Sequence, residues 1–394
     1  MSQITLRCGF IPLVDVAPLV VAREMGFAAE EGVDLTLVKQ PSWSALRDAL
    51  VLGQTDCAHM LSPLPVAMSL GLGGLPTRVD ALMVLSANGN VIGVTPALAQ
   101  RMRAGGWADG FRDPLGTGQH LIRATGGRLR VAVPFPFSMH AELLYHGRGA
   151  RGLAAPGALD IRPVPPPLMP AALAAGEIDA FCVGEPWGSY AVEDGSGELI
   201  LPGAAIWGFA PEKVLAARHD WIEDHPEATS RLMRAVVRAA RWLLERENRT
   251  MAGELLSRAE YLDIPSMIID RALIGRIVTA RRGLQAEAPN FLHFHAKATN
   301  FPWRSQAAWI AGNIARRLGL DRVQAMETGK ACFRSDLYRR YLQPIGIDMP
   351  GASEKVEGAL EHPEAVASTR GHMILGPDRF FDGAVFDPAA PSGD

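Results

Sequence analysis

The stretch "LRCGFIPLVDVAPLVVAREMGFAAEEGVDLTLVKQ", residues 6–40, decides the fold. It begins with an apolar run, continues through a turn into a helical segment that Gly26 is placed to end, and closes with a second run rich in apolar and β-branched residues. The order is strand, helix, strand. Such a unit predicts a parallel sheet with helices packed against it.

A similar pattern returns further along the chain. "LGQTDCAHMLSP" (52–63) resembles "AGEIDAFCVGEP" (175–186), and Gly53 and Gly176 lie 123 positions apart. The same offset, without gaps, relates Asp56 to Asp179, Pro63 to Pro186, and Leu6-Arg7 to Leu129-Arg130. We infer a duplicated α/β unit and therefore two lobes. In such an architecture a ligand lies where the carboxyl ends of the strands of both lobes meet.

Composition and motifs narrow the class of protein. With 394 residues the chain is long enough for two or more cores, and its net charge of −3 argues against a wholesale nucleic-acid binder. The four cysteines are scattered without a CxxC pair, and the start "MSQITLRCGFIPLVD" lacks a secretory h-region. We therefore expect a cytoplasmic location. GxSxG, HExxH and GxxxxGK[ST] motifs are absent from the sequence, so we expect no enzyme, no cofactor and no metal site.

An ordered set of motifs then carries a resemblance. In chain order they are "KQPSWSALRDALVLGQTDCAHMLSPLP", "ANGNVIGV", "FPFSMH", "VPPP", "FCVGEPW", "PEKVLAARHDWIEDHPEAT" and "NFPWRSQAAWI". The chain resembles the nitrate- and bicarbonate-binding receptors of ABC transporters over nearly its whole length. The resemblance implies an α/β, two-lobed, periplasmic-binding-protein-like clamp (type II), each lobe a sheet flanked by helices. We expect lobe I at 1–91 plus 205–394, lobe II at 92–204, and a loosely ordered tail at about 376–394.

The resemblance also implies a set of ligand-binding residues. Two positions depart from the family pattern: Asn90 stands where the family has a glutamine, and Pro134-Phe135-Pro136-Phe137 replaces a glycine-rich turn before the histidine. The implied residues are Trp43, Asn90, His140, Gly184, Glu185, Pro186 and Lys213.

Their chemistry suits a small oxyanion. Nitrate offers only acceptor oxygens, so Lys213 could supply the cation, with N–H donors from Trp43, Asn90 and His140. Each residue also has a simpler explanation. Lys213 could be a solvated surface lysine, and Trp43 could pack within its lobe. Asn90 could serve the turn alone, and His140 could be a structural histidine. Glu185 cannot hold an anion directly. We expect it to pair with Lys213 or another base, or to accept a proton from bicarbonate.

The expected location and the resemblance together point to one branch of the family. The chain is similar to the cytoplasmic nitrate/nitrite sensors of bacterial assimilatory nitrate regulation (NasS type). This implies a receptor that sequesters an antiterminator protein with an RNA-binding domain and releases it when nitrate or nitrite binds, without touching nucleic acid or membrane itself. The alternatives are an exported solute-binding subunit of a nitrate or bicarbonate ABC transporter, and a cytosolic enzyme on the same fold.

Overall fold

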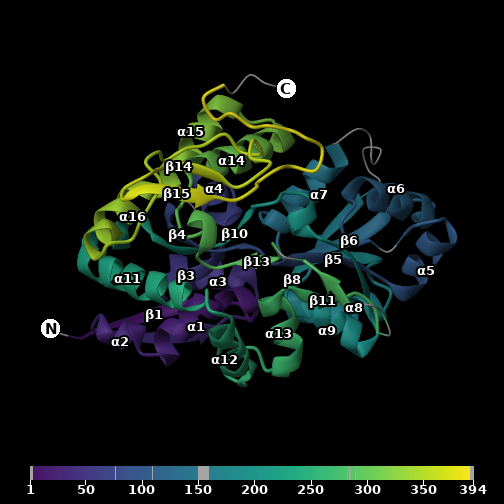
Figure 1. Ribbon diagram of the computed structural model, residues 1–394, viewed down its shortest axis with the longest axis horizontal. Helices are drawn as coiled ribbons and strands as arrows, with labels where there is room; N and C mark the ends of the chain where they lie inside the picture. The colour runs from purple at the N-terminus through teal and green to yellow at the C-terminus, as the bar shows by residue number, and fades with distance from the viewer. Residues whose placement is uncertain are drawn as a thin grey trace.

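The computed structural model describes residues 3–75, 77–108, 110–149, 159–281, 283, 285–288 and 290–390. It contains two large sheets that lie side by side, each covered by helices (Figure 1). The larger sheet has the strand order β13-β4-β10-β3-β1-β2, and the smaller has the order β7-β6-β8-β5-β9. The two-lobed α/β clamp expected from the sequence is confirmed.

The larger sheet belongs to the first lobe. Its strands are β1 (Ile4–Phe10), β2 (Val33–Lys39), β3 (Cys57–Leu61), β4 (Val79–Asn88), β10 (Pro211–Arg218) and β13 (Leu292–His293). The helices of this lobe that precede β4 in the chain are η1 (Val14–Val16), α1 (Ala17–Glu24), α2 (Phe27–Glu30), α3 (Trp43–Val51) and α4 (Pro63–Ser69). The central strands β3, β4 and β10 are buried almost throughout, as expected for apolar runs covered on both faces.

The smaller sheet belongs to the second lobe. Its strands are β5 (Asn90–Val94), β6 (Leu129–Val133), β7 (Leu159–Pro163), β8 (Ala180–Gly184) and β9 (Glu198–Pro202). Its helices are α5 (Pro96–Ala104), α6 (Pro114–Thr125), α7 (Met139–Gly149), η3 (Pro166–Leu168), α8 (Met169–Ala174) and α9 (Trp187–Asp194). The 3-10 turn η4 (Gly203–Ala205) follows β9.

The sequence echo has a structural counterpart in both lobes. In the first, the Asp56 carboxylate accepts a hydrogen bond from the Arg7 amide (2.7 Å), and in the second Asp179 accepts one from the Arg130 amide (2.9 Å). Each aspartate amide in turn donates to the carbonyl of the same arginine. The strands also match, because β1 lies between parallel β2 and β3 as β6 lies between parallel β7 and β8.

The chain changes sheets at two places. Gly89 separates β4 from β5, and η4 with the residues after it leads from β9 back to β10. Asn90 and Val91 pair with Gly184 and Val183 of β8, so they start a strand of the second sheet and not the end of lobe I, where we expected them. The boundary therefore moves by two residues, since a single glycine with φ of 93° is enough to turn the chain between the sheets.

Helices dominate after the second crossing. They are α10 (His219–Asp224), α11 (Pro226–Trp242), α12 (Arg246–Ser257), α13 (Ser266–Ile274), η5 (Ala296–Ala298), α14 (Arg304–Leu318), α15 (Arg322–Cys332), α16 (Ser335–Leu342) and η6 (Gln343–Ile345). Two short hairpins accompany them, β11 (Arg276–Val278) with β12 (Gln285–Glu287) and β14 (Glu364–Ser368) with β15 (Gly371–Leu375). Among the described residues no helix combines the length and the apolar character that crossing a membrane requires.

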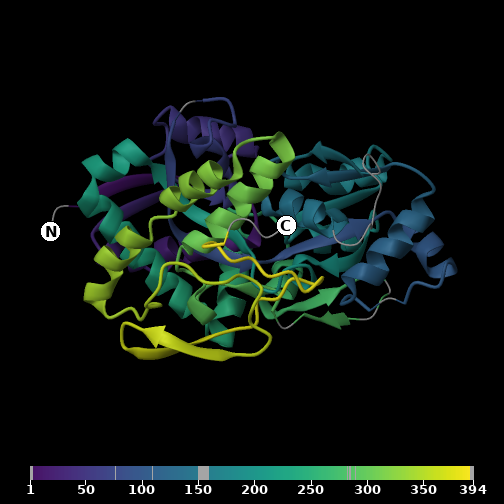
Figure 2. The same cartoon turned by 90° about the horizontal axis from the view of Figure 1, so that it is seen from above.

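The C-terminal segment differs from the loose tail that we expected. Over its described part, residues 376–390, it crosses the join between the lobes (Figure 2). Phe380 is buried and stacks on Trp207 and Trp309, with ring centroids 4.7 and 5.5 Å away. Its content of glycine, proline and aspartate suggested disorder, but the buried Phe380 ring and the ion pair of Asp378 with Lys355 hold it in place.

The two lobes are in contact across their join. Arg317 on α14 forms a bidentate ion pair with Glu142 on α7, with both N–O distances at 2.8 Å. The Trp187 indole donates to the Pro12 carbonyl (2.8 Å), and the Val14 amide donates to the Glu185 carbonyl (2.8 Å). The structure is therefore a closed form of the clamp.

Candidate functional site

Lys213 lies at the centre of a buried polar cluster between the lobes. Its ammonium donates to Asp15 Oδ2 at 2.8 Å and to Glu212 Oε1 at 2.9 Å, and all three side chains are buried. Neighbouring residues of a strand normally point to opposite faces. Here the pairing of β10 with β4 shifts register between Pro211 and Lys213, and the extra residue in this bulge is Glu212. Such a bulge can re-aim a side chain, which accounts for both side chains reaching the cluster.

The first lobe supplies two more groups to the cluster, His59 and Trp43. Asp15 lies in η1, directly after the first strand, and its Oδ1 is 2.8 Å from His59 Nε2 on β3. Trp43 opens α3, where the Ser42 hydroxyl caps the helix by accepting from the Ala45 amide at 3.2 Å, as its position before the helix predicts. The Trp43 ring lies 5.6 Å from the Lys213 ammonium.

The second lobe closes the cluster from the other side. Asn90, the first residue of β5, donates from Nδ2 to Glu212 Oε2 at 2.6 Å, and His140 Nδ1 on α7 lies 3.2 Å from Glu212 Oε1. Gly184 ends β8 beside them. A side chain there would meet Leu13 Cδ2 at 3.2 Å, and both Asp15 Oδ2 and His140 Nε2 at 3.8 Å. The bare glycine therefore lets the two lobes approach.

Several buried polar atoms of the cluster lack a hydrogen-bond partner among the described residues. They are the indole Nε1 of Trp43, both ring nitrogens of His140 and the side-chain oxygen of Asn90. The His140–Glu212 contact is short, but its angles do not make a hydrogen bond. Buried donors are nearly always satisfied in folded proteins. Unpaired N–H groups beside a buried ammonium are what an oxyanion with several acceptor oxygens requires.

Asp15 and Lys213 both keep their charges although they are buried. Burial alone would raise the pKa of Asp15, but Lys213 and His59 hold this pKa below its ordinary value, so Asp15 stays ionised. Burial would likewise lower the pKa of Lys213, and the two carboxyls outweigh it and raise that pKa. Lys213 and Asp15 therefore remain a charged pair.

The other titratable groups of the cluster tend toward their neutral forms. Burial raises the pKa of Glu212 above its ordinary value despite the adjacent Lys213. Burial lowers the pKa of His59, and burial together with Lys213 places the pKa of His140 well below its ordinary value. Both imidazoles are neutral at pH 7, so each carries a single N–H.

The structure brings five of the seven predicted residues together, and two lie differently. Trp43, Asn90, His140, Gly184 and Lys213 meet in the cluster, as described above. The Glu185 carboxylate turns back onto α9 and accepts from the Ser189 amide at 3.0 Å. Our expected Glu185–Lys213 pair is wrong, since Lys213 is held by the closer carboxylates of Asp15 and Glu212. Pro186 follows Glu185 through a cis peptide bond and precedes the first residue of α9.

Sequence reasoning missed Asp15, His59 and Glu212 as members of the cluster. Asp15 and His59 are single polar residues between buried apolar ones, in "PLVDVAP" and "CAHML", and Glu212 precedes Lys213 in the otherwise apolar "APEKVL". A charged or imidazole side chain inside a run that must be buried needs a partner. That signal could have marked all three, although it does not say which groups they meet.

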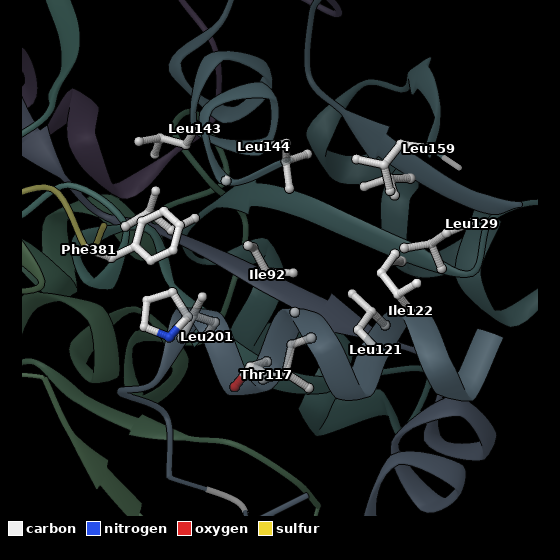
Figure 3. A pocket seen from close by; sticks show the side chains of 17 residues that line it. Ile92, Thr117, Leu121, Ile122, Leu129, Leu143, Leu144, Leu159, Leu201 and Phe381 are labelled. Atoms are coloured by element: carbon white, nitrogen blue, oxygen red, sulfur yellow. The ribbon is translucent and has the colours of Figure 1, made fainter. Parts of the chain in front are cut away.

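A separate cavity lies within the second lobe. Its volume is about 90 Å³, and Figure 3 shows leucine and isoleucine side chains of α6, α7 and the sheet around it. Thr117 supplies a hydroxyl, which accepts from the Trp107 indole at 3.2 Å. An apolar lining offers an anion no compensation for lost water. The described residues also contain no group of three or more His, Cys, Asp or Glu side chains able to hold a metal ion.

Comparison with known proteins agrees with this architecture. The model of the NMT1-like family matches residues 2–257. The nitrate import ATP-binding protein NrtC of Synechocystis sp. PCC 6803 is 32% identical over 400 residues, which cover 100% of this chain and 55% of NrtC. The nitrate/nitrite-binding protein NrtA of Nostoc sp. PCC 7120 is 29% identical over 98% of this chain and 83% of its own length.

Solved structures give the same result. The periplasmic nitrate-binding protein NrtA of Synechocystis PCC 6803 superposes with a TM-score of 0.84 at 27% identity, covering 99% of this chain and 97% of NrtA. The two NrtA proteins are named as binding proteins and not as enzymes. With more than half of its length matched by the family model, the chain belongs to the NMT1-like family.

Proposed function

We propose that this protein is a solute-binding protein whose ligand is nitrate or nitrite, held between the lobes by the Lys213 cluster. The observation that carries the proposal is the pair of unpartnered buried donors, Trp43 Nε1 and the His140 ring, beside a fixed ammonium. The relatives support it, because the NrtA proteins that match nearly the whole chain bind nitrate or nitrite.

The donors at the site favour a small, singly charged oxyanion. Nitrate and nitrite have acceptor oxygens and no proton to donate, so each N–H can be used. Sulfate brings a second negative charge next to Asp15 and Glu212, which already share the one lysine. Moving that extra charge into a buried site is costly when no second cation faces it. We therefore expect discrimination against divalent oxyanions.

Transport is the role that the relatives favour. One relative is a nitrate import ATP-binding protein and another is a periplasmic nitrate-binding protein, so partners from an ABC transporter fit this chain better than the antiterminator that we first expected. The cytoplasmic sensor with an RNA-binding partner is the second proposal. Both roles use the same clamp, in which ligand binding shifts the balance between open and closed forms.

Isothermal titration of nitrate into the wild-type protein and into Trp43→Phe tests the site. The phenylalanine keeps an aromatic ring at this position and removes the indole N–H donor to the anion, so we expect the affinity to fall roughly 10- to 100-fold, as for loss of one hydrogen bond to a charged group. Trp221→Phe is the control, since Trp221 lies on α10 and stacks on His225 away from the cluster. Equal affinities for wild type and Trp43→Phe would remove Trp43 from the site.

A second measurement separates the two roles. Cell fractionation locates the protein, and capture with the nitrate-free and the nitrate-saturated form identifies partners from its own host. Recovery of ABC-transporter membrane components supports the transport role. Recovery of an RNA-binding protein that nitrate releases would instead support the sensor.

A further inference from the structure

The cluster between the lobes contains more negative than positive charge. Its one cation is Lys213, and two carboxylates, Asp15 and Glu212, share that ammonium at 2.8 and 2.9 Å. With both ionised, the buried site carries a net charge of −1 before any ligand arrives. A bound nitrate would make it −2 in a region from which water is largely excluded. Like charges at such short range disfavour each other strongly when buried.

The hydrogen-bonding character of the site shows the same conflict. An ionised carboxylate has only acceptors, and nitrate also has only acceptors, so the two cannot hydrogen-bond to each other. A protonated carboxyl has an O–H donor. One proton on a carboxylate would therefore remove a negative charge and add a donor, leaving Lys213 a larger share of its charge for the anion.

Asp15 is not the group that takes this proton. It has two direct partners, Lys213 Nζ and His59 Nε2, each at 2.8 Å, and both stabilise its ionised form. These contacts hold the pKa of Asp15 below its ordinary value although burial opposes them.

Glu212 is held less firmly in its ionised form. Apart from Lys213 its hydrogen-bond partner is the neutral amide of Asn90, and His140 lies at 3.2 Å without an aligned hydrogen bond. Burial raises the pKa of Glu212. Glu212 also acts on the Cys182 thiol of β8: burial together with the Glu212 charge raises the pKa of that thiol well above its ordinary value, so the thiol stays neutral.

From this arrangement we propose that the oxyanion binds together with one proton from solvent, which Glu212 takes up as a neutral carboxyl. The inference rests on the proposed function, because it assumes that an oxyanion enters this cluster. The step is a simple protonation: a proton leaves water or buffer and forms the Glu212 O–H bond. Where Glu212 was ionised before binding, the net charge of the site therefore stays at −1 when the anion enters.

This coupling fixes the pH dependence of affinity. Where free Glu212 is ionised and bound Glu212 is protonated, the dissociation constant rises roughly tenfold for each pH unit, as linkage to one proton requires. Below the pKa of Glu212 in the free protein the carboxyl is already neutral, and the dependence disappears. Affinity is therefore higher at low pH and declines as pH rises.

Nitrate is the right probe, because it does not titrate in the accessible range and any proton exchanged belongs to the protein. Calorimetric titrations at pH 6 to 9, in pairs of buffers with different ionisation enthalpies, count the protons taken up per nitrate. We expect about one proton per nitrate for the wild-type protein at the alkaline end of the coupled range. Glu212→Gln keeps an acceptor for Lys213 and cannot titrate, so it should bind nitrate with no proton uptake. Glu177→Gln, exposed on the second lobe, should behave as the wild type.

Each outcome decides the question. Nitrate binding to the wild-type protein without proton uptake at any pH overturns the inference and leaves the proposed function intact. Uptake that persists in Glu212→Gln and disappears in His140→Gln assigns the proton to the imidazole and also overturns it. Absence of nitrate binding to the wild-type protein refutes the proposed function itself. If Glu212→Gln fails to fold, the proton count and pH slope of the wild-type protein still decide whether binding is proton-linked, and His140→Gln decides whether the proton is on Glu212.

Discussion

The ion pair between Arg317 and Glu142 offers a direct handle on lobe closure. It joins α14 of the first lobe to α7 of the second, and the Arg317 guanidinium also lies 4.4 Å from the Tyr145 ring centroid. The Glu142 side chain is fully buried and that of Arg317 is 22% exposed. Arg317→Met keeps much of the aliphatic stem and removes the charge, so closure would bury an unpaired carboxylate.

The magnitude follows from that unpaired group. Breaking a buried pair costs about 3–5 kcal/mol, and the partial exposure of Arg317 lowers our expectation to about 2–3 kcal/mol against the closed form. If nitrate binds only the closed form and the open form prevails without ligand, its dissociation constant rises by roughly 30- to 150-fold. Glu142→Gln combined with Arg317→Met should recover much of this loss, since it leaves no buried charge.

Titration calorimetry gives the affinities, and small-angle X-ray scattering reports the change in the radius of gyration as the lobes open. Arg316→Met is the matched control, because Arg316 is the exposed neighbour on the same helix. An Arg317→Met protein with wild-type nitrate affinity and an unchanged scattering profile would refute the assignment of this pair to closure.

Two further predictions concern stability. Burial raises the pKa of Glu185 from 4.5 to about 7. Between these two pH values the folded state holds a proton that the unfolded state has released. The protonated Glu185 carboxyl therefore contributes stability that is fully present below pH 4.5 and is lost as the pH rises through 7, by about 3 kcal/mol in total. Glu185→Gln should flatten the urea-denaturation free energy between pH 5 and 8, and an unchanged slope would contradict the cause. Phe380→Ala should cost about 3–5 kcal/mol by thermal denaturation, because it removes the ring that stacks on Trp207 and Trp309. Val385→Ala, at an exposed position, should cost under about 0.5 kcal/mol, and equal losses would show that the segment is not anchored by Phe380.

The two-lobed fold could be predicted because the duplication keeps its spacing. Asp56 and Asp179 bind the amides of Arg7 and Arg130 in the same way, so a constant offset in the sequence marks a repeated contact in space. The C-terminal segment could not be predicted in this way. Phe380 packs on Trp207, which lies far away in the chain, and composition alone carries no information about such a partner.

The site was predictable only in part, for a similar reason. Trp43, His140 and Lys213 were marked by a resemblance that places them in motifs. Asp15 and Glu212 enter the cluster through local geometry, the turn after β1 and the bulge in β10, and neither feature has a clear pattern in the sequence. The charge balance of the site depends on these two carboxyls.

The central claim is that the cluster between the lobes is an oxyanion site, and a crystal structure of the protein grown with nitrate tests it most directly. We predict nitrate density between the lobes, within hydrogen-bonding distance of Trp43 Nε1 and a ring nitrogen of His140, with the Lys213 ammonium beside it. Nitrate bound elsewhere, with those donors still unpartnered and Lys213 held only by Asp15 and Glu212, would contradict the claim.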